Sequence, residues 1–334
     1  MRIALVSPGF HSYHRSIQFG LEQLGHTVFV VLYDERIGLK GKISGKVSLD
    51  LARKLGADTV AREMRLTTAR VAAEVATLRF DLLLVIKGDV LDPQFVADTG
   101  RSGARTVLWL YDELRRTAHR NDGIAAYDLV ASYSPNDVGE LTGQGIEARL
   151  VPLAFDERLA VAGIDRGSGP DVVFVGARYG RREELLVAAD RAGLSVRAYG
   201  RDWSRNPRDR ARTLNWKRPP IPSNGDLDRE QAARVMQEAV SVLNVHGDQD
   251  GFTMRTFEAA GVGGLQLVDR DDVAAFYQPG AEVLVFRDEA EIVDHVHRAR
   301  REPGWAQGVR VAASARTLAE HTFRHRCADL VDLC

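Results

Sequence analysis

Two carboxylates, Asp250 and Glu258, flank a predicted helix start in residues 250–264, DGFTMRTFEAAGVGG. Gly251 and Thr253 lie where backbone amides at a helix N-terminus would face a phosphate, and Thr253 could also cap the helix. Glu258 is too far along to share a phosphate site, but its carboxylate could accept hydrogen bonds from both vicinal hydroxyls of a ribose. The alternative is a structural acid favoured by the helix dipole, and for Glu258 considered alone that alternative is preferred.

A second candidate for chemistry is the arginine cluster in residues 173–186, VFVGARYGRREELL. A predicted strand ends at Gly176, and Arg178, Arg181 and Arg182 stand at the start of the predicted helix that follows. A planar guanidinium offers paired donors to phosphate oxygens, and a helix N-terminus adds partial positive charge. The pattern favours binding of a pyrophosphate. The alternative is a solvated turn in which these arginines pair with the glutamates that follow them.

The third candidate is the loop of residues 7–16, SPGFHSYHRS, which leaves the first predicted strand. Gly9 permits close approach of a ligand to the backbone, and His11 and His14 lie near the next helix start. The spacing does not match G-x-G-x-x-G, which argues against a nicotinamide-dependent enzyme. The alternative for both histidines is an ordinary position in a surface loop.

All three loops follow predicted strands, and the pattern along the chain predicts how they are positioned. Near-continuous apolar runs alternate with amphipathic stretches, which favours doubly wound parallel sheets covered by helices. Ligands bind such sheets beyond the carboxyl ends of the strands. The predicted strands are 2–7, 27–33, 81–87, 105–111, 128–132, 148–152, 171–176, 195–200, 240–245 and 265–268. The predicted helices are 14–24, 48–78, 93–102, 135–143, 181–192, 228–239, 289–301 and two pieces within 305–333.

Length and composition indicate a two-domain globular protein. The 334 residues suit two domains of about 150 residues each, and the aperiodic residues 155–170 are typical of a linker. Two α/β units in tandem predict a ligand cleft between them. A net charge of −1 indicates neither a nucleic-acid nor a membrane partner. Two cysteines near the C-terminus, no signal-like segment and no apolar run of ~20 residues predict a soluble cytoplasmic protein.

The second half of the chain resembles the nucleotide-sugar-binding half of GT-B glycosyltransferases, in which two acidic residues are separated by seven positions. Here the pair is Asp250 and Glu258, with aspartate in place of the first glutamate. Residues 171–328 are most similar to the spore-maturation CgeB-like branch, through VFVGARYGRREELL, VSVLNVH, MRTFEAAGVGGLQLVD, AEVLVFRDEAEIVDHV and EHTFRHRC. The N-terminal half is similar more loosely, through TVLWLYDE, YDLVASYSP and ARLVPLAFD.

The resemblance implies an α/β GT-B fold of two Rossmann-like domains. These would be an acceptor domain (1–155), a linker (156–170), a donor domain (171–304) and C-terminal helices (305–334) that pack back on the acceptor domain. Glu258 would bind the ribose, the arginines the diphosphate, and loop 215–222 the base. The acceptor would enter near Gly9 to His14 and near Asp112. The predicted substrate- and donor-binding residues are Gly9, Gly176, Arg178, Arg181, Arg182, Lys217, Asn244, Gly251, Phe252, Thr253, Met254, Arg255 and Glu258.

The reaction implied is glycosyl transfer from a nucleoside-diphosphate sugar to a small-molecule, glycan or protein acceptor. Negative charge builds on the departing phosphate, and the arginines would stabilise it. No resident metal or other cofactor is expected, although GDQD at 247–250 superficially offers two aspartates. The spacing of the acid pair favours retention, whereas an inverting enzyme would need a protein base. The candidate catalytic residues are His11, His14, Asp112 and Asp250.

Two other function classes stay open beside the transferase. A sugar-nucleotide epimerase or hydrolase of the same fold would use the same arginines and the same glutamate. A non-catalytic nucleotide-binding scaffold would bind a donor without turning it over. The arginine-rich stretch 201–218 has two interpretations, a loop that orders over the ligand or a solvated surface.

Overall fold

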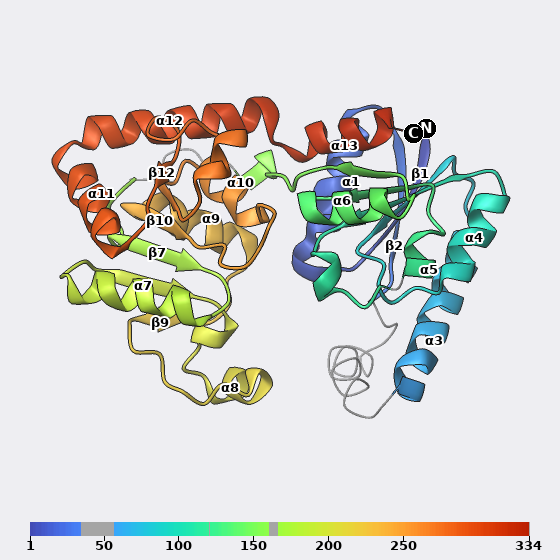
Figure 1. Ribbon diagram of the computed structural model, residues 1–334, viewed down its shortest axis with the longest axis horizontal. Helices are drawn as coiled ribbons and strands as arrows, with labels where there is room; N and C mark the ends of the chain where they lie inside the picture. Colours follow the sequence, from blue (N-terminus) through green and yellow to red (C-terminus); the bar gives the residue numbers. More distant parts are fainter. Residues whose placement is uncertain (35–56, 120, 160–165, 334) are drawn as a thin grey trace. The chain divides into compact units, whose positions relative to one another are not determined.

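The computed structural model describes residues 1–34, 57–119, 121–159 and 166–333 of the chain. The chain divides into two compact units. Met1–Leu153 together with Phe323–Cys334 form the N-terminal unit, and Ala154–Thr322 form the C-terminal unit. Each unit contains one six-stranded sheet with helices packed around it (Figure 1). The predicted α/β class is therefore confirmed in both halves of the chain.

All paired strands of the N-terminal sheet are parallel, in the order β2-β1-β3-β4-β5-β6. Strands β3 and β4 are buried almost throughout, because helices cover the sheet and their apolar runs need no polar face. The elements are β1 (Arg2–Ser7), η1 (Phe10–Ser12), α1 (Tyr13–Gln23), β2 (Thr27–Leu32), α3 (Ala57–Val75), β3 (Leu82–Ile86), α4 (Pro93–Arg101), β4 (Arg105–Leu110), η2 (Leu114–Arg116), α5 (Asn121–Ile124), β5 (Leu129–Ser132), α6 (Pro135–Gly143), β6 (Ala148–Leu150) and α13 (Phe323–Asp332).

Helix starts in this unit follow from their capping residues. The side chain of Asp92 accepts a hydrogen bond from the backbone amide of Gln94 at 2.9 Å and begins α4. Ser134 plays the same part for α6. A proline follows each cap, at the helical position where its missing N–H is not needed. The helix predicted over 48–78 is observed as α3, and residues 48–56 lie outside the described residues.

The C-terminal sheet is also parallel, in the order β12-β11-β10-β7-β8-β9. Its core consists of apolar side chains from β7, β8, β10 and β11 packed against α7 and α11. The elements are η3 (Glu157–Leu159), β7 (Val172–Val175), α7 (Gly180–Arg191), β8 (Val196–Tyr199), η4 (Arg201–Trp203), α8 (Pro207–Thr213), β9 (Ser223–Asn224), α9 (Arg229–Glu238), β10 (Ser241–Asn244), α10 (Met254–Gly261), β11 (Gln266–Val268), η5 (Asp271–Ala275), β12 (Leu284–Val285), α11 (Glu289–Arg301) and α12 (Pro303–Glu320).

The two C-terminal helices belong to different units. Helix α13 packs on α1 of the N-terminal unit, so closely that a Cβ added at Gly20 would lie 3.0 Å from the backbone nitrogen of Arg324. Helix α12 packs on α10 of the C-terminal unit, where Ser314 donates a hydrogen bond to the carbonyl oxygen of Gly261 at 3.0 Å. Helix α13 is therefore part of the N-terminal unit, and α12 is part of the C-terminal unit. Among the described residues, no helix has both the length and the apolar character needed to cross a bilayer.

Candidate functional site

Loops after β7, β10 and β11 lie at one edge of the C-terminal sheet, because neighbouring parallel strands end on the same side. Arg182 on α7 joins two of them. Its Nε and Nη2 donate to the carbonyl oxygen of Val245 at 3.0 and 2.7 Å, and its Nη1 donates to that of Ala177 at 3.2 Å. The arginine cluster and the stretch after β10 are therefore neighbours. Residues 176–182, 245–258 and 269–272 are called the carboxyl-edge site below.

Arg178 is buried, with a side chain 3% exposed. Its Nε donates to Oε2 of Glu183 at 2.5 Å, its Nη1 donates to the carbonyl oxygen of Lys217 at 2.7 Å, and its guanidinium lies 5.4 Å from the ring centre of Trp203. The hydrogen bond from Arg178 holds the pKa of the Glu183 carboxyl below its ordinary value. Arg178 thus ties the backbone at residue 217 to the start of α7.

Arg181 and Lys217 lie at the solvent-exposed rim, with side chains 48% and 78% exposed. The Nη1 of Arg181 lies 3.2 Å from Oε1 of Glu289, and the Nζ of Lys217 lies 3.3 Å from Oε1 of Glu183. The Arg181–Glu289 pair is exposed on both sides and contributes little to stability, whereas Glu183 is only 17% exposed. Arg181 can therefore exchange its carboxylate for a phosphate without disturbing the fold.

Gly176 lies where β7 leaves the sheet. Its amide donates to the carbonyl oxygen of Tyr199 at 2.9 Å, and its own carbonyl accepts from Nε1 of Trp203 at 3.1 Å. A Cβ at Gly200, which has a φ of 150°, would collide with the same carbonyl. Glycine is thus required at position 200, because two backbone segments cross there.

Arg270 was not predicted from the sequence, yet it organises the loop before α10. Its Nη1 donates to the carbonyl oxygen of Gln249 at 2.7 Å and its Nη2 to that of Asp250 at 2.9 Å. The guanidinium also pairs with Asp272 and lies 4.4 Å from the ring centre of Phe252. Arg270 lies two residues after a predicted strand, and this position is the feature of the sequence that could have identified it as a site residue.

A buried histidine–carboxylate pair joins the ends of β10 and β11. His246 is 2% exposed, and its Nδ1 donates to Oδ1 of Asp269 at 2.9 Å. Burial acts to raise the pKa of Asp269, but the hydrogen bonds from the ring and the backbone amide of His246 hold that pKa below its ordinary value. The pair fixes the point at which the chain leaves β10.

Asn244 belongs to a buried polar network that joins β10, β11 and α10. Its Nδ2 donates to Oγ1 of Thr256 at 3.0 Å and to Oε1 of Gln266 at 2.9 Å. The Nε2 of His246 lies 2.9 Å from the same threonine oxygen. In the structure both amide hydrogens of Asn244 hold α10 against the sheet, and the donor-binding role predicted for this residue stays a prediction.

Glu258 lies just over one turn into α10, with a side chain 5% exposed. Its Oε2 is 2.8 Å from Nη1 of Arg255, so the two predicted donor-binding residues form an ion pair along the helix. Thr253 occupies the N-cap position, as predicted, but its side chain makes no capping hydrogen bond. The predicted side-chain cap is therefore wrong.

The remaining predicted residues of this stretch point mainly inward. Phe252 and Met254 are 6% and 8% exposed. The Phe252 ring packs edge-on against His246 and Phe276, with ring centres 4.9 and 5.4 Å apart. Gly251 is buried and Asp250 is half-buried. Because Phe252 and Met254 pack into the interior, a ligand at this loop would meet their backbone more than their side chains.

The loop after β1 places the two predicted histidines in different surroundings. His11 is exposed, has a φ of 46° and has its ring 3.9 Å from that of Phe10. Such a φ is uncommon outside glycine. His14 lies on α1 and is 9% exposed. The amide of Gly9 donates to Oδ1 of Asp34 at 2.7 Å. The surface-loop interpretation therefore suits His11 and does not suit His14.

Asp112 follows β4, and residues that were not predicted surround it. The Nζ of Lys87, which follows β3, lies 3.9 Å from Oδ2 of Asp112. Burial raises the pKa of Asp112, and the charge of Lys87 opposes that rise. His119 donates a hydrogen bond to the carbonyl oxygen of Lys87, and burial lowers its pKa. Strands β1, β3 and β4 are neighbours, so these groups share the carboxyl edge of the N-terminal sheet with the loop after β1.

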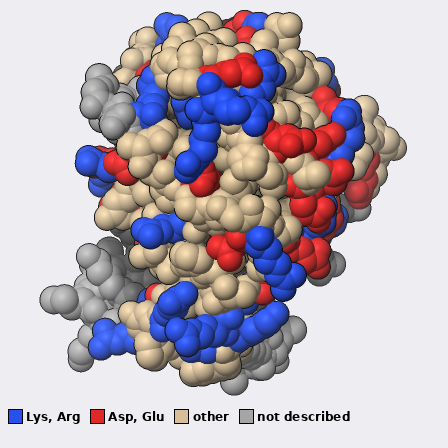
Figure 2. All heavy atoms as spheres, turned by 90° about the vertical axis from the view of Figure 1, so that its left-hand side faces the viewer, with Lys and Arg blue, Asp and Glu red and all other residues tan. Residues whose placement is uncertain are grey.

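Residues 201–218 form a basic surface that includes α8. Arg205, Arg208, Arg212 and Arg218 are exposed, as is Trp216. In Figure 2, Lys and Arg side chains gather at the lower end of the face shown, the level at which Figure 1 draws α8. Anionic ligands would be attracted to this surface.

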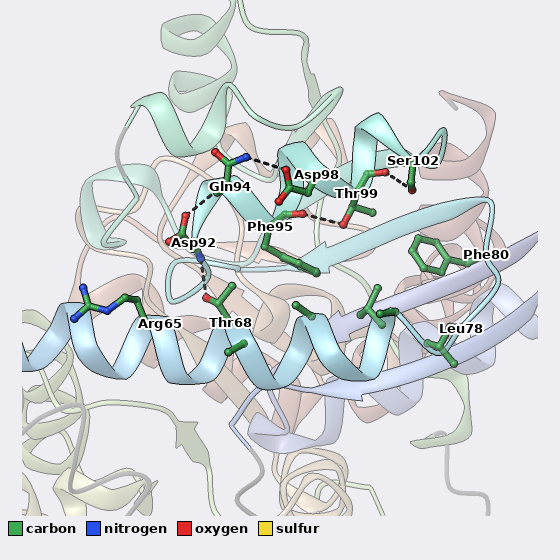
Figure 3. A pocket seen from close by; sticks show the side chains of 14 residues that line it. Arg65, Thr68, Leu78, Phe80, Asp92, Gln94, Phe95, Asp98, Thr99 and Ser102 are labelled. Carbon is green, nitrogen blue, oxygen red and sulfur yellow. Dashed lines mark hydrogen bonds between the residues drawn. The ribbon is translucent and has the colours of Figure 1, made fainter.

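A cavity of about 620 Å³ lies between α3 and α4 in the N-terminal unit (Figure 3). Its lining is largely apolar and includes Leu78, Phe80 and Phe95, while the Thr68 hydroxyl accepts a hydrogen bond from the amide of Asp92 at 2.9 Å. Arg65 is the single cation among the described residues that line it. The cavity therefore does not suit a diphosphate.

Comparisons with known proteins connect both units to one kind of fold. Residues 181–332 match the family model described as glycosyl transferase-like. No curated protein matches the sequence. Sucrose-phosphate synthase from Thermosynechococcus elongatus is similar with a TM-score of 0.65 and 15% identity, covering 100% of this chain and 98% of that one.

Two further solved structures match over the same extent. HepE from Anabaena, in complex with UDP and glucose, has a TM-score of 0.60 and 13% identity, covering 100% of this chain and 99% of that one. The DNA-modifying enzyme β-glucosyltransferase has a TM-score of 0.61 and 13% identity, covering 100% and 98%. With two parallel six-stranded sheets, flanking helices and whole-length matches of this kind, the chain has the GT-B fold of glycosyltransferases.

Proposed function

We propose that the protein is a glycosyltransferase that moves a sugar from a nucleoside-diphosphate sugar to an acceptor. The observation that carries the proposal is the carboxyl-edge site. Its arginines on α7 follow β7 and its glutamate on α10 follows β10, and these two strands are neighbours in one sheet. The segment that matches the glycosyl transferase-like model contains both helices almost entirely. The GT-B fold supports the same assignment.

The arginines suit the charge that develops during transfer. Negative charge builds on the leaving phosphate as the anomeric bond breaks, and preorganised positive charge stabilises it most effectively. Backbone carbonyls already hold the guanidiniums of Arg178 and Arg182 in place. Arg181 and Lys217 at the rim would turn toward the phosphates. In this proposal Arg178 and Arg182 provide positive charge at fixed positions, and the side chains of Arg181 and Lys217 move to contact the phosphates.

The proposal includes transfer without a metal ion and with retention of the anomeric configuration. The four cations would supply the charge that a metal supplies elsewhere, and the leaving phosphate would take the proton of the acceptor. If transfer instead inverts, Asp112 is the favoured base over His11 and His14. Burial raises the pKa of Asp112, which makes its carboxylate a better proton acceptor.

The similarity to the CgeB-like branch belongs to the same proposal. It rests on the motifs from VFVGARYGRREELL to EHTFRHRC, which form the β7–α7 turn at one end and the junction of α12 and α13 at the other. The proposed partners are a nucleotide-sugar donor and an acceptor held at the carboxyl edge of the N-terminal sheet. Lys87 and His119 join Asp112 as candidate acceptor contacts there.

A donor screen tests the proposal directly. UDP-, GDP-, ADP-, CMP- and dTDP-sugars are added singly, and the melting temperature is recorded, since a ligand that binds only the folded state raises it. UDP-glucose is the first donor to test, because the HepE structures contain UDP and glucose or UDP-glucose. The expected result is stabilisation by one class of donor and release of its nucleotide only when an acceptor mixture is present.

Other outcomes identify the alternatives. An altered or hydrolysed sugar formed from donor alone would indicate an epimerase or hydrolase. Donor binding without turnover in any acceptor mixture would indicate a scaffold. If no nucleotide sugar stabilises the protein, the proposed donor site is wrong.

A further inference from the structure

Two arginines meet at the edge of the C-terminal sheet opposite the carboxyl-edge site. Arg310 on α12 donates from Nη2 to the carbonyl oxygen of Val240 at 2.7 Å, and Val240 directly precedes β10. The guanidinium of Arg166 packs against Gly263, where an added Cβ would lie 3.1 Å from Nη2 and 3.2 Å from Cζ. Gly263 precedes β11. Both arginines therefore lie at the amino ends of the strands.

Among the residues that the structure describes, no carboxylate pairs with either guanidinium. Arg310 is 5% exposed, and the Nε atoms of both Arg310 and Arg166 are buried without a hydrogen-bond partner. Within the described part of the chain, neither arginine forms an ion pair with a carboxylate. Burial lowers the pKa of Arg310, and the positive charge of Arg166 lowers it further. The positive charges of Arg166 and Arg310 thus repel each other, and Arg310 is largely shielded from solvent.

This arrangement is unfavourable unless something else neutralises it. A buried charge without a counter-ion is strongly destabilising, and a guanidinium has five N–H donors to satisfy. The carbonyl of Val240 accepts from one of those on Arg310. Two glycines, which have no side chains, also lie beside the two arginines. Gly167 and Gly263 have φ values of 81° and 78°, and a Cβ at Gly167 would lie 3.7 Å from Nη2 of Arg310.

We propose that Arg166 and Arg310 bind a small oxyanion, a free phosphate or a phosphoryl group, at the amino edge of the C-terminal sheet. A tetrahedral oxyanion offers several acceptors to two planar forks of N–H donors, and its charge removes the repulsion between them. The site lies at the other end of the strands from the proposed donor site. It does not depend on glycosyl transfer.

The test is calorimetric titration of the full chain with inorganic phosphate at constant ionic strength, in a buffer without other oxyanions. Wild type is expected to bind phosphate saturably, and Arg310→Met and Arg166→Met are each expected to weaken binding by about tenfold or more. Methionine keeps the apolar stem of the side chain. Arg301→Met removes an exposed cation near the end of α11 and is the matched control, with unchanged affinity expected. Arg166 is only half-buried, so its variant tests the site even if Arg310→Met does not fold.

Phosphate could also enter the carboxyl-edge site, and one further variant separates the two sites. Arg181→Met alters the proposed donor site and is expected to leave this phosphate affinity unchanged. Sulfate is expected to compete with phosphate, and acetate to compete more weakly because it offers fewer acceptor oxygens. The proposal is overturned if wild type binds no phosphate, or if Arg166→Met and Arg310→Met bind it as tightly as Arg301→Met does. Neither result bears on the donor site.

Discussion

Replacement of Glu258 is the sharpest test of the donor site. In the proposed complex its carboxylate accepts hydrogen bonds from both ribose hydroxyls while it pairs with Arg255 at 2.8 Å. A hydrogen bond to a charged group contributes about 1.5–3 kcal/mol. Glu258→Gln replaces one acceptor oxygen by a donor and removes the charge, so the loss is about one such bond, or roughly 10- to 100-fold in affinity. Glu258→Ala removes both bonds and is expected to weaken binding by about 100-fold or more.

The effect on folding is separable from the effect on binding. The Arg255 side chain is 24% exposed, so its guanidinium keeps access to water when the partner is removed. The stability loss should therefore stay below the roughly 3–5 kcal/mol seen when a fully buried ion pair is broken. Calorimetric titration with the donor found by the screen measures affinity, and thermal melting verifies the fold. Glu302→Gln removes a carboxylate that is 49% exposed just after α11 and is the control.

A folded Glu258→Ala protein with wild-type affinity for the donor would refute this reasoning. It would show that the carboxylate acts within the fold, in contacts such as its ion pair with Arg255, and does not bind the donor. Equal losses in Glu258→Gln and Glu302→Gln would likewise refute it, because a general reduction of negative charge would then explain both.

Three further predictions follow from the geometry. Gly261→Ala places a Cβ 2.5 Å from Cδ1 of Phe155, so it should lower the free energy of unfolding by about 1–3 kcal/mol, and a double-mutant melting cycle with Phe155→Leu should recover part of that loss. If Asp112 is the base, its carboxylate must be ionised, so activity falls as the pH drops through its raised pKa. Lys87→Met removes the positive charge that opposes this rise in pKa, so the acidic limb of the kcat/KM profile should move to higher pH. Treatment with EDTA should leave donor turnover unchanged, and a loss restored by a divalent cation would contradict metal-independent transfer.

Much of the fold could be predicted, because strands buried on both faces are nearly continuous apolar runs. Strands β1, β3 and β4 end within one residue of their predicted limits. The elements that were missed carry little such signal. Helix α8, PRDRART, has no apolar periodicity, and β9 and β12 are two residues long. Their places are determined by tertiary contacts, such as the hydrogen bond from the amide of Ala198 in β8 to the carbonyl of Pro222 just before β9.

The candidate site could be located from the sequence but not resolved in detail, because spacing identifies charged groups and does not identify their partners. Arg178, Arg182 and Arg270 direct much of their hydrogen bonding to backbone carbonyls. Every residue has a backbone carbonyl, so the sequence does not show which carbonyl oxygens accept hydrogen bonds from these arginines. The His246–Asp269 pair did carry a signal, since both residues directly follow predicted strands.

The use of carbonyls also distinguishes positioning from binding among the arginines. A guanidinium held by two or more carbonyls keeps its full positive charge, whereas one held by a carboxylate is largely neutralised. Arg182, which donates to the carbonyl oxygens of Val245 and Ala177, therefore places a fixed positive charge directly beside the loop after β10. Arg178 is partly neutralised by Glu183, which in turn holds Lys217 at 3.3 Å. A diphosphate that binds Lys217 would remove one of the two cations that pair with Glu183, and Glu183 would then pair with Arg178. Ligand binding by Lys217 would in this way change the contacts of the carboxylate that holds the β7–α7 turn.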